Sequence, residues 1–122
     1  RNILNKRCYR YRLTVFPIEN GIGINEYEMC EKSGQINDYY RIDYMRDHIR
    51  AMRDAVEFDG VNVMGYLGWG LIDILSSSGD MRKRYGVVFV NRTNEDLRDL
   101  KRVPKKSYYW LQNVINTNGE VL

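Results

Sequence analysis

Two short apolar runs constrain the fold of this 122-residue chain more than any other feature. Residues 13–18 and 61–70 contain no charged side chain, and the first run stops at Glu19-Asn20-Gly21, in which Asn-Gly is a strong turn signal. A strand that is apolar throughout, without polar alternation, is typical of a parallel sheet that is buried on both faces. We therefore predict two buried, parallel strands, the first of which ends at Glu19.

A helix is expected between the two runs. Asn37-Asp38 supplies an N-cap, and the helix should end near residues 57–60, where the chain turns at an Asp-Gly pair. Its apolar stripe consists of Tyr40, Tyr44, Ile49, Met52 and Val56. The arginines of this helix, Arg41 included, are expected largely on its other faces.

The rest of the chain adds two helices and one short strand. Residues 1–9 have the pattern of a helix end, and residues 105–116 that of a helix whose first turn follows a proline. Residues 85–90 are strand-like, whereas residues 22–36 and 71–84 have the composition of loops. The alternation of strands and helices predicts an α/β fold with a parallel sheet.

Two principal strands do not make a stable α/β domain, because their unpaired edges would face water. The chain has the length of one domain, shows no internal repeat and begins without an initiator Met. We therefore expect a segment of a larger protein, which in isolation associates with itself or with a partner through its apolar surface.

Composition narrows the classes of function. The net charge is +3, and the basic clusters at 82–84 and 101–106 are expected to be solvated faces rather than a nucleic-acid site. The sequence contains no run of about 18 apolar residues, so it predicts no membrane span. Residues 1–7 lack the apolar core of a signal peptide. Cys8 and Cys30 share no metal-ligand spacing with each other or with His48, so we expect no bound metal and a reducing, cytoplasmic location. His48 has no evident partner, and we interpret it as a structural or surface residue.

Glu19 is the first candidate for chemistry. It lies at the C-terminal end of a predicted parallel strand, where the catalytic side chains of barrels of alternating strands and helices project. A carboxylate there can attack the anomeric carbon of a sugar and leave again from the resulting glycosyl ester. A Glu that only closes a loop would have the same local pattern, so this assignment depends on the residues around it.

Several ordered blocks of the sequence resemble one enzyme family. Residues 16–21, Phe-Pro-Ile-Glu-Asn-Gly, resemble the nucleophile motif of glycoside hydrolase family 1, and residues 65–73, Gly-Tyr-Leu-Gly-Trp-Gly-Leu-Ile-Asp, resemble its eighth barrel strand. Residues 40–49 resemble the helix after the nucleophile strand, and residues 83–86 and 105–110 resemble the closing hairpin and final helix. The resemblance covers almost the whole chain but about a quarter of a family enzyme. It implies that residues 1–122 are one incomplete segment of a catalytic (β/α)8 TIM barrel, its C-terminal portion from strand 7 to the final helix.

The loop after Trp69 resembles that of the phospho-glycosidase branch of this family. Ordinary β-glucosidases carry Glu-Trp seven and eight residues after this Trp, whereas this chain has Ser76 and Ser77, followed by Lys83 and Tyr85 at the spacing of that branch. A Glu would repel a 6-phosphate, whereas Ser76, Lys83 and Tyr85 all donate hydrogen bonds to phosphate oxygens. The resemblance also implies that Trp69 is part of the sugar platform. The small Ser77 resembles the arrangement for glucose, because 6-phospho-β-galactosidases have a Trp at that position.

The resemblance implies a retaining 6-phospho-β-glucosidase with Glu19 as its nucleophile and with no metal or organic cofactor. Such an enzyme needs a second carboxyl group about 5 Å away, and the Asn-Glu-Pro motif that carries the family's acid/base is absent from these residues. We therefore expect the chain alone to be inactive and its missing partner to be the N-terminal part of the barrel. Three alternatives stay open: a 6-phospho-β-galactosidase segment, a non-catalytic sugar-phosphate-binding module and a nucleic-acid-binding domain.

Overall fold

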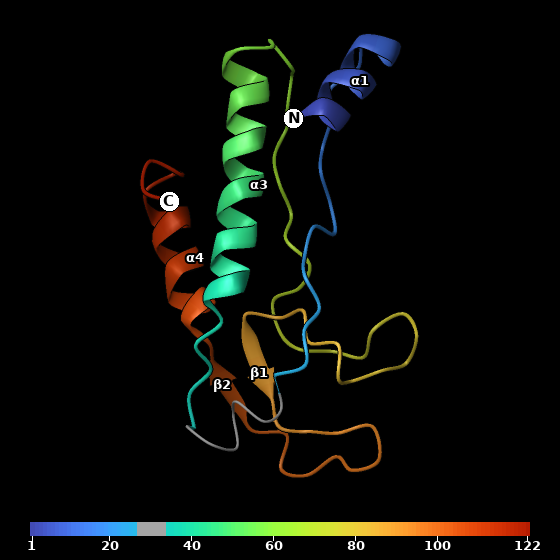
Figure 1. Cartoon of the computed structure of the whole chain (residues 1–122), viewed down its shortest axis with the longest axis vertical. Helices are drawn as coiled ribbons and strands as arrows, with labels where there is room; N and C mark the ends of the chain where they lie inside the picture. The colour runs from blue at the N-terminus through green and yellow to red at the C-terminus, as the bar shows by residue number, and fades with distance from the viewer. Residues whose placement is uncertain (27–33) are drawn as a thin grey trace.

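The computed structural model of the chain describes residues 1–26 and 34–122. Its helices and strands are, in chain order, α1 (Asn2–Tyr11), α3 (Tyr39–Glu57), β1 (Val88–Val90), β2 (Arg102–Pro104) and α4 (Lys106–Asn116). Figure 1 shows α3 and α4 side by side, α1 separated from α3 by an extended stretch of chain, and the two short strands at the opposite end from α1. All three predicted helices are confirmed.

The two predicted long strands lie side by side as parallel extended segments. Val15 pairs with Val63, and Asn20 pairs with Gly68, in both cases in the parallel sense. Backbone hydrogen bonds continue between these two bridges. The predicted parallel pairing is therefore confirmed, although it consists of isolated bridges rather than a continuous ladder.

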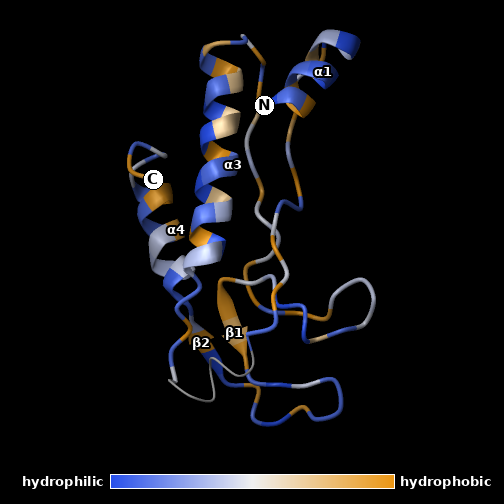
Figure 2. Ribbon diagram, viewed as in Figure 1, coloured by the Kyte–Doolittle hydropathy of each residue, from blue (hydrophilic) through white to orange (hydrophobic). Residues whose placement is uncertain are grey.

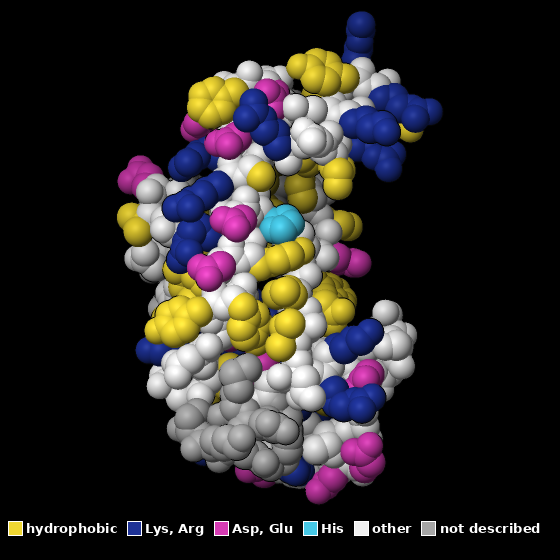
Figure 3. Space-filling view, viewed as in Figure 1, with side chains coloured by type: hydrophobic (Ala, Val, Ile, Leu, Met, Phe, Trp, Pro, Cys, Tyr) yellow, Lys and Arg dark blue, Asp and Glu magenta, His cyan; other side chains and the backbone are white. Residues whose placement is uncertain are grey.

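The prediction that both segments are buried on both faces is wrong for this chain. Leu13, Ile18 and Met64 expose 65%, 58% and 70% of their surface. Figure 3 shows hydrophobic side chains gathered on the surface in the middle of the molecule, with Lys and Arg concentrated around α1 and along α3. A parallel strand is buried only where neighbouring elements cover both of its faces. The described residues do not provide all of that cover.

β1 and β2 form an antiparallel hairpin, in which Phe89 of β1 pairs with Val103 of β2. β1 confirms the second half of the strand predicted at 85–90. β2 is a strand that the sequence does not predict, because it combines an arginine with a proline and so lacks the composition of a strand. A parallel bridge between Ile72 and Val88 joins the hairpin to the chain that follows the second extended segment.

The hydrophobic core is small and is contributed by α3, α4, β1 and the adjoining chain. Among the described residues, the buried apolar side chains are Ile36, Ile42, Met45, Ala55, Val61, Met81, Val87, Phe89, Val90 and Val114. Figure 2 shows β1 as a hydrophobic strand and both colours along α3 and α4. The predicted stripe of α3 is wrong in part, because Val56 is exposed while Arg41 is buried. Arg41 is tolerated inside because carboxylates surround it, as described below.

Asp38 precedes α3 as predicted, but its carboxylate makes no capping hydrogen bond to that helix. Instead, Oδ1 accepts from the Ser107 amide at 2.9 Å, and Oδ2 accepts from the Ser107 hydroxyl at 2.5 Å. Ser107 lies in the first turn of α4, so Asp38 satisfies a free amide at the start of the other helix. The predicted cap of α3 is therefore corrected: this carboxylate ties the beginning of α3 to the beginning of α4.

Candidate active site

Glu19 ends the first extended segment and is exposed to solvent. Beside it, the Asn20 amide donates to the Leu67 carbonyl at 3.3 Å, and the Trp69 amide donates to the Asn20 carbonyl at 2.8 Å. These two bonds hold the backbone next to Glu19 against the segment that leads to Trp69. Glu19 has a φ of 58°, a left-handed conformation that is uncommon for a residue with a Cβ and that is concentrated at functional sites. The carboxylate thus lies at the carboxyl end of two parallel segments, as the sequence predicts.

Two glycines let the segment after Glu19 approach the two predicted aromatic site residues. A Cβ on Gly21 would lie 2.0 Å from the Trp69 carbonyl oxygen, and a Cβ on Gly23 would lie 2.5 Å from Cζ of Tyr85. Both distances are far below van der Waals contact, so these positions need the absence of a side chain. The structure therefore brings the chain around Glu19, Trp69 and Tyr85 into one region.

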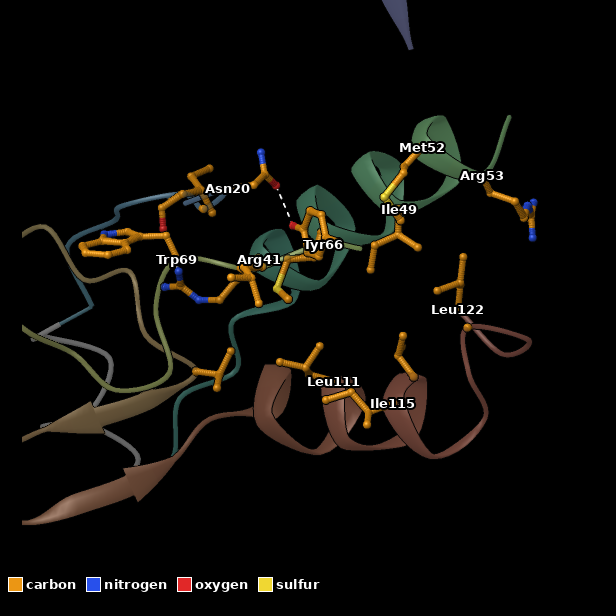
Figure 4. Close-up of a pocket in the computed structure, with 18 of the residues that line it drawn as sticks. Asn20, Arg41, Ile49, Met52, Arg53, Tyr66, Trp69, Leu111, Ile115 and Leu122 are labelled. Atoms are coloured by element: carbon orange, nitrogen blue, oxygen red, sulfur yellow. Dashed lines mark hydrogen bonds between the residues drawn. The ribbon is translucent and has the colours of Figure 1, made fainter. Parts of the chain in front are cut away.

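Asn20 is held by two tyrosines rather than projecting into solvent. The Tyr66 hydroxyl donates to Asn20 Oδ1 at 2.6 Å (Figure 4). Asn20 Nδ2 donates to the Tyr44 hydroxyl at 3.3 Å. Burial raises the pKa of Tyr66 to about 12, which agrees with a protonated, donating hydroxyl. Tyr44 and Tyr66 are thus hydrogen-bond partners of Asn20 that the sequence patterns do not reveal. The available signal is that a buried tyrosine hydroxyl usually has a hydrogen-bond partner.

A cavity of about 670 Å³ opens beside this region. Asn20, Trp69 and Tyr85 belong to its lining, and apolar side chains of α3 and α4 line another part of its wall. Figure 4 labels Ile49 and Met52 on α3, Leu111 and Ile115 on α4, and Leu122 at the end remote from Trp69. An apolar cavity does not suit a phosphate group. The two exposed charged candidates, Glu19 and Lys83, are not part of its lining.

Ser76 is buried within a compact turn of the loop that follows Trp69. Its hydroxyl lies 2.9 Å from that of Ser78 and accepts from the Asp80 amide at 3.1 Å. The Arg82 guanidinium, hydrogen-bonded to Asp80, holds the pKa of that carboxyl well below its usual range. The loop therefore presents Asp80 as one half of an ion pair rather than as a free negative charge.

Ser77 and Lys83 are exposed on the same loop. The structure brings Tyr85 against the Glu19 segment at Gly23, and Ser76, Lys83 and Tyr85 remain the predicted phosphate ligands. Their joint role stays a prediction.

A cluster of buried charges lies beneath this region. Its members are Glu26, Asp38, Arg41, Asp73, Arg84 and Lys105, whose side chains are at most 2% exposed. Lys105 Nζ donates to Asp73 Oδ1 at 3.0 Å and also to the Glu26 carboxylate. Arg84 Nη1 lies 3.6 Å from Asp73 Oδ2, and burial raises the pKa of Asp73 against the attraction of Lys105. The three cations and three carboxylates form one connected network in which most groups have partners.

This cluster corrects the prediction that the two basic runs are solvated faces. Arg84 of the first run and Lys105 of the second are buried. The carboxylates that pair with Lys105 lie 79 and 32 residues away in the sequence, at Glu26 and Asp73. Since the pairing depends on contacts over such separations, a local pattern of lysines and arginines does not reveal it.

The described residues offer neither a metal site nor a helix suited to a bilayer. No group of three or more histidine, cysteine or acidic side chains within 1–26 and 34–122 is arranged to hold a metal ion. No helix in those ranges is long and apolar enough to span a membrane. His48 is exposed, and its Nδ1 lies 2.8 Å from the Tyr44 carbonyl oxygen, which agrees with a surface or structural role. Cys8 is a free, half-buried thiol, and Cys30 lies outside the described residues.

The parallel segments, the helices packed beside them and the carboxylate at a strand end define part of a (β/α)8 barrel. The model of glycosyl hydrolase family 1 matches residues 1–120. The chain therefore belongs to glycosyl hydrolase family 1. The family 1 β-glucosidase from Thermotoga maritima has the same arrangement, with a TM-score of 0.80 and 32% identity over 98% of this chain and 26% of that one.

Two curated relatives are more similar in sequence. The aryl-phospho-β-D-glucosidase BglC from Bacillus subtilis is 50% identical over 98% of this chain and 24% of its own length. The 6-phospho-β-glucosidase AscB from Escherichia coli is 47% identical over 98% of this chain and 25% of its own length. The chain thus spans about a quarter of the length of these relatives and is a partial segment of their barrel.

Proposed function

We propose that residues 1–122 supply the nucleophile and the phosphate-binding loop of a retaining 6-phospho-β-glucosidase. The observation that carries this proposal is the pairing of the Glu19 segment with the segment that leads to Trp69. This pairing puts an exposed carboxylate at the end of two parallel segments, where barrel enzymes carry their chemistry. The names of the phospho-glucosidase relatives support the same substrate class.

In the proposed reaction, Glu19 attacks the anomeric carbon and forms a glycosyl ester, while the bond to the aglycone oxygen breaks. A carboxylic acid from the rest of the enzyme gives its proton to that oxygen and later takes a proton from the water that cleaves the ester. Two inversions at the anomeric carbon retain its configuration. Asn20, fixed by Tyr44 and Tyr66, holds the backbone next to the nucleophile.

The remaining site residues have binding roles in this proposal. Trp69 forms part of the platform for the sugar ring, and Ser77 leaves space at the position that favours glucose. Ser76, Lys83 and Tyr85 bind the 6-phosphate, since each can donate a hydrogen bond to its oxygens. Lys83 is exposed, so its flexible stem has room to bring the ammonium group to the phosphate.

The test compares three chromogenic substrates with the full-length enzyme that carries this segment. We expect hydrolysis of the 6-phospho-β-glucoside with retained configuration, and much lower kcat/KM for the 6-phospho-β-galactoside and for unphosphorylated β-glucoside. Preference for the galactoside would assign the enzyme to the other phosphosugar. Binding of glucose 6-phosphate without turnover of any substrate would favour a non-catalytic module.

The isolated segment has a different expected behaviour. We propose that the remainder of the barrel supplies the acid/base and covers the apolar surface of residues 13–18 and 61–70. The 122-residue chain alone should therefore be inactive and should self-associate, because this surface stays exposed. Turnover of the 6-phospho-β-glucoside by the pure segment, or a monomer at millimolar concentration, would contradict this expectation. A cytoplasmic location stays a prediction.

A further inference from the structure

Arg41 lies beneath the candidate site, between the segment that follows Glu19 and the segment that contains Tyr85. Its side chain is 2% exposed. Nη1 donates to the Ile22 carbonyl at 2.6 Å and to the Tyr85 carbonyl at 2.9 Å. Ile22 follows Glu19 by three positions, and Tyr85 belongs to the proposed phosphate loop. A single nitrogen therefore binds the backbones of both halves of the site.

The other donors of the Arg41 guanidinium are also engaged. Nε donates to Asp38 Oδ2 at 2.9 Å, and Nη2 donates to the Arg84 carbonyl at 3.1 Å and to the Glu26 carboxylate. An arginine has five N–H donors in a rigid planar fork, and all five have acceptors here. Burial alone would lower the pKa of Arg41, but Glu26 raises it, so the side chain stays charged. A lysine has three donors on a flexible stem and would leave at least two acceptors without this partner.

Further contacts fix the relative position of the same two chain segments. The Ile24 amide donates to the Arg84 carbonyl at 3.1 Å, and the Arg84 amide donates to the Ile24 carbonyl at 3.0 Å. Between Ile22 and Ile24, the Cα of Gly23 packs so closely on the Tyr85 ring that a Cβ has no space. A shift of one segment would therefore shift the other.

We propose that Arg41 is a positioning residue that fixes the separation between the Glu19 carboxylate and the 6-phosphate-binding side of the site. This inference rests on the proposed function. Binding of a remote phosphate accelerates the reaction only if it holds the anomeric carbon in position for attack. That effect requires a rigid connection between the phosphate ligands and the nucleophile, since a misplacement of about 1 Å can lower a rate about 100-fold.

The experiment replaces Arg41 by lysine in the full-length enzyme, which keeps the positive charge between Asp38 and Glu26. The readout is the ratio of kcat/KM for 4-nitrophenyl 6-phospho-β-glucoside to kcat/KM for the unphosphorylated glucoside. Partial unfolding lowers both values equally and cancels in the ratio. We expect Arg41→Lys to lower the ratio about tenfold or more, chiefly through kcat for the phosphorylated substrate. Arg50→Lys, on the exposed side of the same helix, is the matched control and should leave it unchanged.

A second variant keeps the test decisive if Arg41→Lys does not fold. Gly23→Ala adds a Cβ that would clash with the Tyr85 ring, and so changes the contact between the same two chain segments. It should therefore also lower the ratio. An unchanged ratio in the folded variant, Arg41→Lys or Gly23→Ala, would overturn the positioning role. A ratio near one in the unmodified enzyme would overturn the proposed function instead, so the two failures are distinguishable.

Discussion

The buried charges around Arg41 and Lys105, which we call the junction, and the two extended segments, residues 13–18 and 61–70, are built in opposite ways. In the junction, Lys105 and Arg41 are buried with carboxylates and carbonyls as partners. In the extended segments, apolar side chains such as Leu13 and Met64 face outward without cover. Polar groups buried with partners indicate an interface that is complete within this chain, whereas exposed apolar strands indicate one that is not. The comparison teaches that the connection between the two halves of the site is contained in this segment, while the barrel wall is not.

The largest expected effect is on catalysis at the end of the extended segments. We expect Glu19→Gln in the full-length enzyme to lower kcat for the 6-phospho-β-glucoside at least about 1,000-fold, because an amide does not form the glycosyl ester. Steady-state kinetics measure the loss, and Glu120→Gln, an exposed glutamate near the C-terminus of this chain, is the control. Retention of more than a tenth of the activity would remove Glu19 from its proposed role.

The next effect is on stability and concerns the junction. Lys105→Met would leave Glu26 and Asp73 buried without their shared cation, so we expect it to lower the free energy of unfolding by about 3–5 kcal/mol. Lys101→Met changes an exposed lysine of the same basic run and should stay within about 0.5 kcal/mol of the unmodified enzyme. Urea unfolding of the full-length proteins compares the two. Equal midpoints would show that the buried pairs contribute no more than a surface charge.

A smaller effect is expected at the phosphate loop. Lys83→Met keeps most of the side-chain length and removes the ammonium group, so kcat/KM for the phosphorylated substrate should fall about 10- to 100-fold. The value for the unphosphorylated glucoside should change little, because that substrate has no charge for Lys83 to bind. The same loss with both substrates would indicate a structural effect, and no loss with either would exclude Lys83 as a phosphate ligand.

The smallest effect is expected at an exposed ion pair, which contrasts with the buried pairs of the junction. Arg1 donates two hydrogen bonds of 2.6 Å to Asp59 and, with Asn5, lowers the pKa of that carboxyl to about 2. Because the folded-state pKa lies below the ordinary value of 3.8, this pair stabilises the fold above pH 4, and its contribution is lost as the pH falls through about 2.

The variant Asp59→Asn should therefore be slightly less stable than the unmodified enzyme at pH 6. The difference between the two urea midpoints should shrink as the pH is lowered to 2. It should also decrease in high salt, since exposed charges are screened. A difference that is independent of pH would show that the charge of Asp59 is not the cause.

Local patterns predicted much of the fold and part of the site. Caps and periodicity predicted the three helices, and the apolar runs predicted the parallel pairing that brings Glu19 beside the segment leading to Trp69. They did not predict the burial of Arg41 or Lys105, because each is explained only by carboxylates that the fold brings from other parts of the chain. Helical periodicity classifies Arg41 as a surface residue, since it counts polarity and not partners.

The prediction that Asp38 caps α3 was wrong for a similar reason. Asp38 is at a suitable position to cap α3, but Ser107 of α4 provides two donors to the same carboxylate in the fold. Tyr85 is a further case, because the sequence suggests a phosphate ligand, whereas the close packing of its ring on Gly23 becomes evident only in three dimensions. The residues that connect elements are thus the ones that sequence patterns predict least well.

The most direct test of the central claim is covalent trapping of the nucleophile in the full-length enzyme. A 2-deoxy-2-fluoro-β-glucoside 6-phosphate with a good leaving group slows hydrolysis of the glycosyl ester, and peptide mapping by mass spectrometry then locates the attached sugar phosphate. We predict an adduct on the peptide that contains Glu19 and much slower labelling by the same reagent without its phosphate. An adduct on another carboxylate, or equal labelling by both reagents, would contradict the account.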